Sequence, residues 1–255
     1  MRAAALLLLL LTEGAGEPPR EPRGQHLHPL GLPSLTEGFV IEALLRNNRP
    51  LLAMVSLPSF KGETSVGIVE EQDRRSSEDR YFVVVSRPKA SLRGQYWDAL
   101  RAGLAKKSDP EGASSPVEDD VAALASVKTE LLESRAPLKK EAACELSLIW
   151  ASALGAVRPD TSGVIVRDGT RFVFTNGRVG TTTSPEPASP MDALVTLGNT
   201  LMCYGEAPQA RRGEAEKQLL LQVQATAKSL GADISPTASA RTSRLPSPCS
   251  GTGRE

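Results

Sequence analysis

The histidines are the first candidates for chemistry, because imidazole serves both as a metal ligand and as a general base. The chain has only His26 and His28, and they form an H-x-H pair in a Pro-rich segment without a third ligand nearby. We therefore expect no metal site. Since no histidine remains elsewhere, a Ser-His-Asp or Cys-His arrangement has no base, and the sequence offers no nucleophilic centre of that kind.

Carboxylates are the next candidates, because many glycosidases work with a pair of Asp or Glu side chains. The acidic residues fall mostly on charged helix faces and loops, as at Glu70, Glu71, Glu78, Asp79, Asp119 and Asp120. No such pair is flanked by the aromatic side chains that a sugar site uses. The sequence therefore names no catalytic residue and no cofactor, and it favours a protein without enzymatic activity.

The cysteines show no metal-binding pattern and leave a structural disulfide open. Cys144, Cys203 and Cys249 lie far apart and form no CxxC pair, so zinc is not expected. Cys144 and Cys203 each fall in an expected helix, and in an oxidising compartment they could form a disulfide. The alternative is that both are small buried apolar side chains.

A binding surface has two candidates in the sequence. The large aromatic residues are the first, and the simpler interpretation is that each closes the core: Tyr96, Trp97, Trp150 and Tyr204. The second is the Thr/Ser/Pro loop at 181–190, which joins an expected hairpin to a capped helix, where rigid scaffolds often carry binding groups. A plain connector is again the simpler interpretation.

The chain begins with a pattern typical of a secretory signal. Arg2 supplies a positive charge, and residues 3–11 form an unbroken apolar run within the roughly 7–15 residues that such signals have. This run is shorter than the about 20 residues that span a bilayer. We assign residues 1–16 to a signal peptide cleaved near Ala15 or Gly16, and we expect an exported protein, periplasmic or extracellular.

The first part of the mature chain predicts an antiparallel meander of three strands. Apolar or β-branched runs occupy residues 51–57, 65–71 and 81–85. A charged loop at 72–80 separates the last two runs. A short helix is expected at 95–104, while residues 38–46 are compatible with a helix or a strand.

The second part predicts helices around one hairpin. Apolar residues recur at helical spacing at Val121, Leu124, Val127 and Leu131, and after Pro137 a second stripe runs through residues 138–153. Asp168-Gly169 stands between apolar runs at 164–166 and 172–174, which is a strong signal for a tight hairpin. Asn176-Gly177 marks another turn.

Two further helices are expected toward the C-terminus. Ser189-Pro190 with Asp192 is typical of a capped helix start, and Gly205 after Tyr204 suggests its stop. A last helix is expected over about 214–230, ending at Gly231.

These elements define the expected domains. Residues 17–34 and 233–255 are rich in Pro, Ser, Gly and charge and are expected to be a disordered linker and a disordered tail. Residues 35–232 are expected to form a single α+β domain, with a candidate internal boundary at 106–116. Its fold would be a small antiparallel sheet with helices packed on one face.

The charge balance limits the classes of partner. Lys and Arg number 30, as do Asp and Glu, so there is no electrostatic case for nucleic acid or for an acidic membrane surface. No later window approaches a spanning length, so no transmembrane segment is expected in the mature chain.

One resemblance concerns residues 120–205. A helix with Trp150-x-x-x-Leu154, the Asp168-Gly169 hairpin, the Ser184-Pro185 loop and a closing helix resemble a loose group of uncharacterised exported proteobacterial proteins. In that group a Trp often precedes the Ser-Pro, whereas this chain has Thr183. The resemblance implies an envelope location and no known activity.

The sequence thus predicts an exported bacterial protein that binds another envelope protein or an envelope component without catalysis. A carboxylate-dependent hydrolase acting on an envelope glycan or peptide is the alternative, and a soluble ligand-binding protein is the third hypothesis. A deep pocket with two close carboxylates and aromatics would favour the hydrolase, and a shallow surface with an exposed apolar patch would favour the binding protein.

Overall fold

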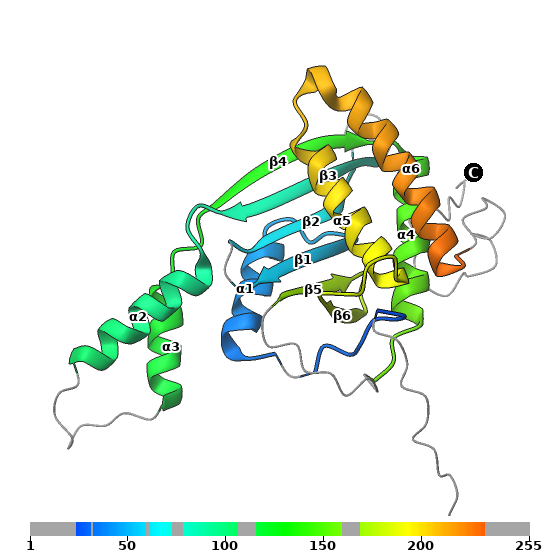
Figure 1. Cartoon of the computed structure of the whole chain (residues 1–255). Helices are drawn as coiled ribbons and strands as arrows, with labels where there is room; N and C mark the ends of the chain where they lie inside the picture. The colour runs from blue at the N-terminus through cyan, green and yellow to red at the C-terminus, as the bar shows by residue number, and fades with distance from the viewer. Residues whose placement is uncertain are drawn as a thin grey trace, which may run out of the picture.

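The protein is built on one antiparallel sheet (Figure 1). A computed structural model describes residues 24–31, 33–59, 62–72, 79–106, 116–159 and 169–232. Six strands in these residues follow the order β4-β3-β2-β1-β5-β6. They are β1 Leu52–Pro58, β2 Thr64–Gln72, β3 Asp79–Pro88, β4 Leu131–Leu138, β5 Thr170–Thr175 and β6 Val179–Thr183. The α+β class and the antiparallel sheet expected from the sequence are confirmed.

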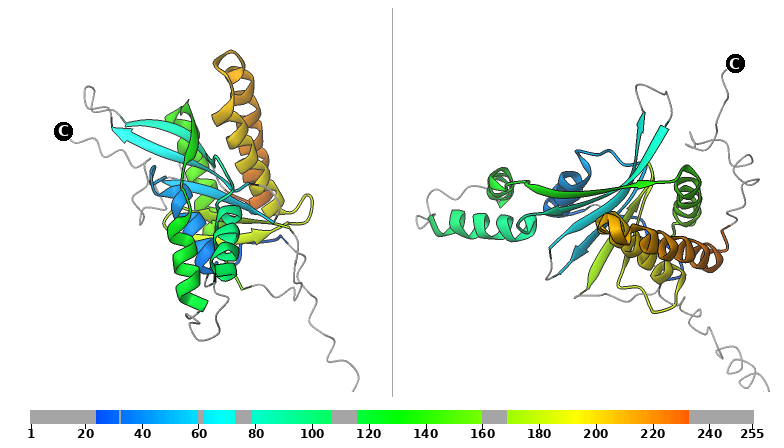
Figure 2. Two further views of the ribbon diagram at one scale, coloured as in Figure 1. Left: turned by 90° about the vertical axis from the view of Figure 1, so that its left-hand side faces the viewer. Right: turned by 90° about the horizontal axis from the view of Figure 1, so that it is seen from above.

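The helices divide between the two faces of the sheet. They are α1 Leu35–Leu45, α2 Leu92–Lys106, α3 Pro116–Ser126, α4 Lys140–Gly155, α5 Pro190–Glu206 and α6 Arg212–Leu230, with the short 3-10 helix η2 Gln209–Arg211 before α6. The main core lies between the sheet and α4, α5 and α6. A smaller core lies under α1 on the opposite face, and α2 and α3 extend away from the sheet as a pair (Figures 1 and 2).

Alternation along β1 explains why two cores form. Leu52 and Met54 point into the main core, whereas Val55 and Leu57 point toward Val40 of α1. Successive side chains of a strand face opposite sides of a sheet, so a strand with apolar residues at both parities must be covered on both faces. Of residues 38–46, which the sequence left undecided, 38–45 lie in α1, which covers this second face.

The expected three-stranded meander is present and is longer than expected. β1, β2 and β3 pair in sequence with the register Leu52↔Ile68 and Ile68↔Val83. The meander then continues into β4, which pairs with β3 along its whole length, from Tyr81↔Leu138 to Pro88↔Leu131.

The helical prediction through Leu131 and the restart at Pro137 are corrected by β4. Helix α3 ends at Ser126, and residues 131–138 form an edge strand. Ala136 and Leu138 face the main core, while Glu133 and Arg135 face away from it. A proline is tolerated here because an edge strand has one side without ladder hydrogen bonds.

The hairpin predicted around Asp168-Gly169 is also corrected. Residues 172–174 pair with β1 on one side and with β6 on the other, so neither hydrogen-bonding edge is left for residues 164–166. The β5–β6 hairpin instead turns at Asn176-Gly177, where Gly177 has a φ of 90°. Residues 160–168 lie outside the described part of the chain.

The C-terminal helices begin as predicted. Ser189 caps α5 by accepting a hydrogen bond from the Asp192 N–H at 3.2 Å, and the Asp192 carboxylate accepts one from the Ala188 N–H at 2.9 Å. Gly231 ends α6 in the left-handed conformation, with a φ of 61°. Gly205 does not end α5, which continues to Glu206.

Residues 24–31 differ from the disordered linker expected at 17–34. Leu27 is fully buried in the main core, and His28 exchanges backbone hydrogen bonds with Thr181 of β6 at 2.7 and 2.8 Å. An apolar side chain and a free strand edge on β6 together order this segment. The expected signal peptide at 1–16 and the expected tail at 233–255 lie outside the described residues.

Two smaller expectations concern Cys203 and residues 106–116. Cys203 is an exposed free thiol, so the candidate disulfide between Cys144 and Cys203 is not formed. Residues 107–115 lie outside the described part, and β3 and β4 on either side of them pair in one sheet.

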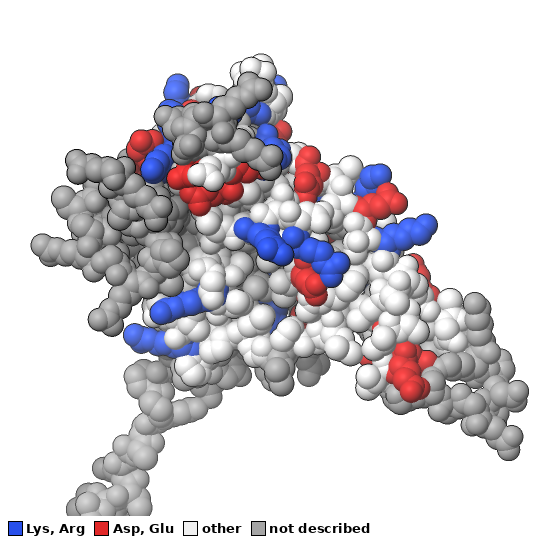
Figure 3. Space-filling view, turned by 180° about the vertical axis from the view of Figure 1, so that it is seen from behind, with Lys and Arg blue, Asp and Glu red and all other residues white. Residues whose placement is uncertain are grey.

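Seen from behind, acidic and basic side chains are interspersed on the surface (Figure 3).

Candidate functional site

Of the residues singled out in the sequence, the structure brings together only Tyr96, Trp97 and Asp120 among those it describes. Trp150 and Tyr204 are buried in the main core, and the indole N–H of Trp150 donates to the Ala53 carbonyl at 3.3 Å. His26 and His28 stack edge to face beside β6. Among the described residues, no group of three or more His, Cys, Asp or Glu side chains is placed to hold a metal ion. Tyr96, Trp150 and Tyr204 are buried, whereas Trp97 is 51% exposed.

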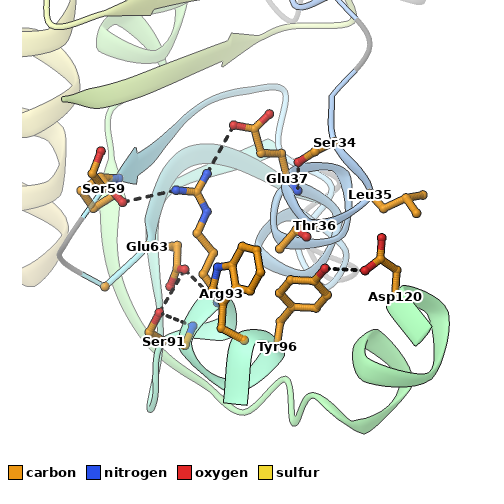
Figure 4. A pocket seen from close by; sticks show the side chains of 14 residues that line it. Ser34, Leu35, Thr36, Glu37, Ser59, Glu63, Ser91, Arg93, Tyr96 and Asp120 are labelled. Atoms are coloured by element: carbon orange, nitrogen blue, oxygen red, sulfur yellow. Dashed lines mark hydrogen bonds and ion pairs between the residues drawn. The ribbon is translucent and has the colours of Figure 1, made fainter. Parts of the chain in front are cut away.

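Trp97 lines a cavity of about 640 Å³ where α1, α2 and α3 meet the β1–β2 connection. Figure 4 shows side chains from the first turns of α1 and α2, such as Glu37 and Arg93, reaching toward each other in it. Its walls carry hydroxyl groups from Ser34, Thr36, Ser59 and Ser91 and charged groups from Glu37, Glu63, Arg93 and Asp120. Three carboxylates thus stand against one guanidinium, so the walls carry a net negative charge.

Glu63 is the most buried of these acids, with only 1% of the residue exposed. Its carboxylate accepts hydrogen bonds from the Leu92 N–H at 3.2 Å, the Arg93 N–H at 3.0 Å and the Ser91 hydroxyl at 3.1 Å. It therefore binds the N-terminus of α2, where unpaired N–H groups and the helix dipole both favour an anion. The helix start that would otherwise bind an external anion is already occupied.

Glu37 is held between two arginines. Its carboxylate accepts from Arg93 at 3.3 Å and from Arg171 of β5 at 3.1 Å, and its own N–H donates to the Ser34 cap of α1 at 3.2 Å. Arg93 also donates to the Pro58 carbonyl at 3.4 Å, and Arg171 donates to the Leu30 carbonyl at 3.0 Å. This network ties α1, α2 and β5 together, so its charges stabilise the shape of the cavity.

Asp120 of α3 makes one hydrogen bond, accepting from the Tyr96 hydroxyl at 2.8 Å. This bond, with burial of the ring, raises the pKa of Tyr96 above its ordinary value. Tyr96 stacks edge to face on Trp97, with ring centroids 5.0 Å apart. The pair fixes Trp97 against α2 while leaving half of the indole open to solvent.

The apolar part of the site lies at its rim. Leu35 and Trp97 are both on the cavity wall and are 54% and 51% exposed. Val117 and Val121 of α3 add exposed apolar side chains, at 61% and 56%. Leu35 and Trp97 are the two exposed apolar side chains on the cavity wall itself, and such side chains at a cavity are typical of a surface that another molecule covers.

Sequence reasoning named Tyr96, Trp97 and Asp120 but missed Glu37 and Glu63. Each of the two missed residues is an isolated acid with no motif around it. Only Glu37, two residues after the capping Ser34 and before an apolar run, carries the weak signal of a helix start. The 181–190 loop leads into the Ser189 cap of α5 and lies against Gly24, so the structure gives it the role of a connector.

Comparisons with known proteins leave the family open. No protein-family model matches the chain, and no curated protein and no solved structure matches it either. In the part of the chain that the structure describes, no helix has the length and apolar character needed to cross a membrane.

Proposed function

We propose that this chain is a non-enzymatic binding protein, exported to the bacterial envelope, that holds a segment of another envelope protein or an envelope component in the α1–α2–α3 cavity. The observation that carries the proposal is the rim of that cavity, where Leu35 and Trp97 are half exposed beside walls whose Glu37 and Glu63 carboxylates are already bound within the protein. Exposed tryptophans in such places are frequent anchors of protein interfaces.

The charge and the apolar rim of the cavity indicate what kind of segment it would bind. Its net negative walls favour a neutral or basic segment, and its apolar rim favours a segment with a large apolar side chain. The export part of the proposal rests on the Arg2 and 3–11 signal pattern alone. N-terminal sequencing of the mature protein should begin between residues 15 and 20, whereas an intact Met1 on cytosolic protein would rule export out.

The binding proposal is tested by capture from native envelope extract. Trp97→Ala should lose a partner that the unmodified protein retains, because it removes the rim anchor without touching the cores. Leu221→Ala is the matched control, since Leu221 is 60% exposed on α6, away from the cavity. Equal capture by all three proteins would contradict the proposal.

A carboxylate-dependent hydrolase remains the second candidate because Glu37, Glu63 and Asp120 line one cavity with two aromatics. Against it stands the engagement of the acids: Glu37 is bound by two arginines and Glu63 by three donors within the protein, so neither carboxylate is free to contact a substrate. Asp120 is the least engaged acid. Turnover of an envelope glycan or peptide that Asp120→Asn abolishes would establish the hydrolase, and we expect no turnover.

A further inference from the structure

The two edges of the sheet differ in whether another segment pairs with them. The β6 edge is covered, because His28 exchanges two backbone hydrogen bonds with Thr181. The β4 edge pairs only with β3 in the described part of the chain, and Figures 1 and 2 show it along the opposite border of the sheet. An open edge presents a row of backbone donors and acceptors to any strand that fits.

The phase of the β3–β4 ladder tells which backbone groups of β4 point outward. The Lys89 N–H donates to the Glu130 carbonyl at 2.9 Å, in continuation of the register Pro88↔Leu131. Along one strand of an antiparallel pair, the backbone N–H and C=O groups of successive residues point alternately toward the partner strand and away from it. Even-numbered residues of β4 therefore bond to β3, and Leu131, Glu133 and Arg135 direct their N–H and C=O groups to the open edge.

Pro137 agrees with this phase and sets the limit of the open edge. It is odd-numbered, so its missing N–H removes nothing from the β3–β4 ladder. Its carbonyl accepts a hydrogen bond from the Tyr204 hydroxyl of α5. Among the described residues, no hydrogen bond reaches the outward backbone groups of Leu131, Glu133 or Arg135, so residues 131–135 form the usable edge.

The charges on this edge are complementary to themselves. In an antiparallel pair of two β4 strands related by a two-fold axis at Ser134, Glu133 stands opposite Arg135 of the second copy, and Arg135 stands opposite its Glu133. Both pairs are odd-numbered, so they exchange backbone hydrogen bonds. Leu131 stands opposite Pro137 of the second copy, which has no N–H to donate, so the ladder between the copies is centred on residues 133–135. Moving the axis to Glu133 or to Arg135 would place like charges directly opposite each other, which is destabilising.

We propose that a second copy of this chain pairs with β4, which gives a two-fold dimer with one continuous sheet through both copies. Glu133 and Arg135 set the register, while backbone hydrogen bonds join the strands. Within one copy Asn48 donates to Glu133 at 2.7 Å, and Arg135 binds Glu71 at 2.5 Å and lies over the Phe82 ring. These contacts hold both side chains on the face of the sheet opposite the main core.

The surroundings of β4 add contact area to the dimer. The corner between α5 and α6 projects past β4 in Figure 1. Leu132 shares the parity of Ala136 and Leu138, so it lies on the same face as these helices, yet it is 55% exposed. Paired edges alone bury less than the about 1,200 Å² of a stable interface, and coverage of Leu132 by the second copy's corner supplies the rest.

Charge exchange tests the register in sedimentation equilibrium of the full chain. Glu133→Arg and Arg135→Glu should each weaken the dimer by about tenfold, because each sets two like-charge pairs across the axis. The double variant E133R/R135E restores opposite charges and should restore the dimer. A protein that is monomeric at all concentrations, or a dimer that the single changes leave unaltered, would overturn the proposal.

A cross-link tests the position of the axis independently of charge. In a Cys203→Ser background, Ser134→Cys should form a disulfide-linked dimer on oxidation, because facing residues of that pair have Cα atoms about 4.5 Å apart. Leu132→Cys is the matched control, since its two copies would lie roughly 13 Å apart at about 3.3 Å per residue. Equal cross-linking of both variants, or of neither, would contradict the register.

Discussion

At the scale of single residues, burial of the tyrosine hydroxyl groups makes stability depend on pH. All three tyrosines, Tyr81, Tyr96 and Tyr204, are at most 4% exposed, and each has a pKa above its ordinary value. Burial is the main cause for Tyr81 and Tyr204, and for Tyr96 it is the hydrogen bond to Asp120. In each case the neutral hydroxyl is favoured in the folded protein.

A dependence of stability on alkaline pH follows from these shifts. Above the ordinary pKa of about 10 the unfolded chain releases tyrosyl protons that the folded chain keeps, so the free energy of unfolding should fall as pH rises. Ultraviolet titration should show less tyrosinate in the folded protein than in the unfolded protein at pH values near 10, with a step in absorbance on unfolding. Tyr81→Phe should reduce the pH slope by about one proton.

Lysine and arginine also lose protons at alkaline pH, but they do so equally in the Tyr81→Phe variant and in the unmodified protein. The difference between their slopes therefore isolates Tyr81. If tyrosinate absorbance rose fully near pH 10 while the protein stayed folded, the hydroxyl groups would be more accessible than the structure places them.

At the scale of elements, Gly205 decides how closely α5 approaches the sheet. A Cβ at this position would lie 2.6 Å from the Val85 Cγ2 atom and 3.1 Å from the Val83 Cγ1 atom. The glycine therefore serves the contact between α5 and β3 rather than the end of the helix. Helix geometry alone would favour alanine here.

Substitution of Gly205 should consequently reverse the usual order of helix propensity. Gly205→Ala should destabilise the protein by about 1–3 kcal/mol, because it forces atoms into a filled core. Gly213→Ala in α6 is the matched control, since a Cβ there meets nothing within 4 Å, and it should be neutral or stabilising. Urea unfolding compares the two, and equal effects would mean that α5 can shift without cost.

The same scale shows what the sequence can and cannot predict. β1, β2 and β3 are predictable because they are runs of apolar or β-branched residues, and α6 because its apolar residues recur at helical spacing before Gly231. β4 was missed because Leu131 continues the spacing of α3 by coincidence and Pro137 argues against a strand. Its strand character depends on pairing with β3, which is a long-range fact.

The candidate site shows the same limit more strongly. Trp97 and Tyr96 could be singled out by type, but the role of Glu37 depends on Arg93 and Arg171, which are distant in sequence. Glu63 likewise caps a helix that begins only at Leu92. No local pattern records such partners, so the cavity follows from the fold and not from a motif.

At the scale of the whole molecule, residues 24–31 act as a strap across the sheet edge and the helices. Leu27 enters the main core, and its carbonyl accepts from the Arg158 N–H at 2.9 Å. The Gly24 carbonyl accepts from the Met191 N–H at the start of α5, also at 2.9 Å. The strap thus joins β6, α5 and the end of α4, which makes it part of the folded domain.

Truncation measures what the strap contributes. A chain of residues 24–232 should keep it, whereas a chain of residues 33–232 loses Leu27 but retains the Ser34 cap of α1. The shorter chain should be less stable by about 2–5 kcal/mol, the range for removing a fully buried leucine. Leu27→Ala in the full chain should cost a similar amount, while Leu221→Ala, at an exposed position, should change stability by less than about 0.5 kcal/mol. Equal unfolding midpoints for the two truncated chains would show that the strap only rests on the domain, and the domain boundary would then return to residue 35.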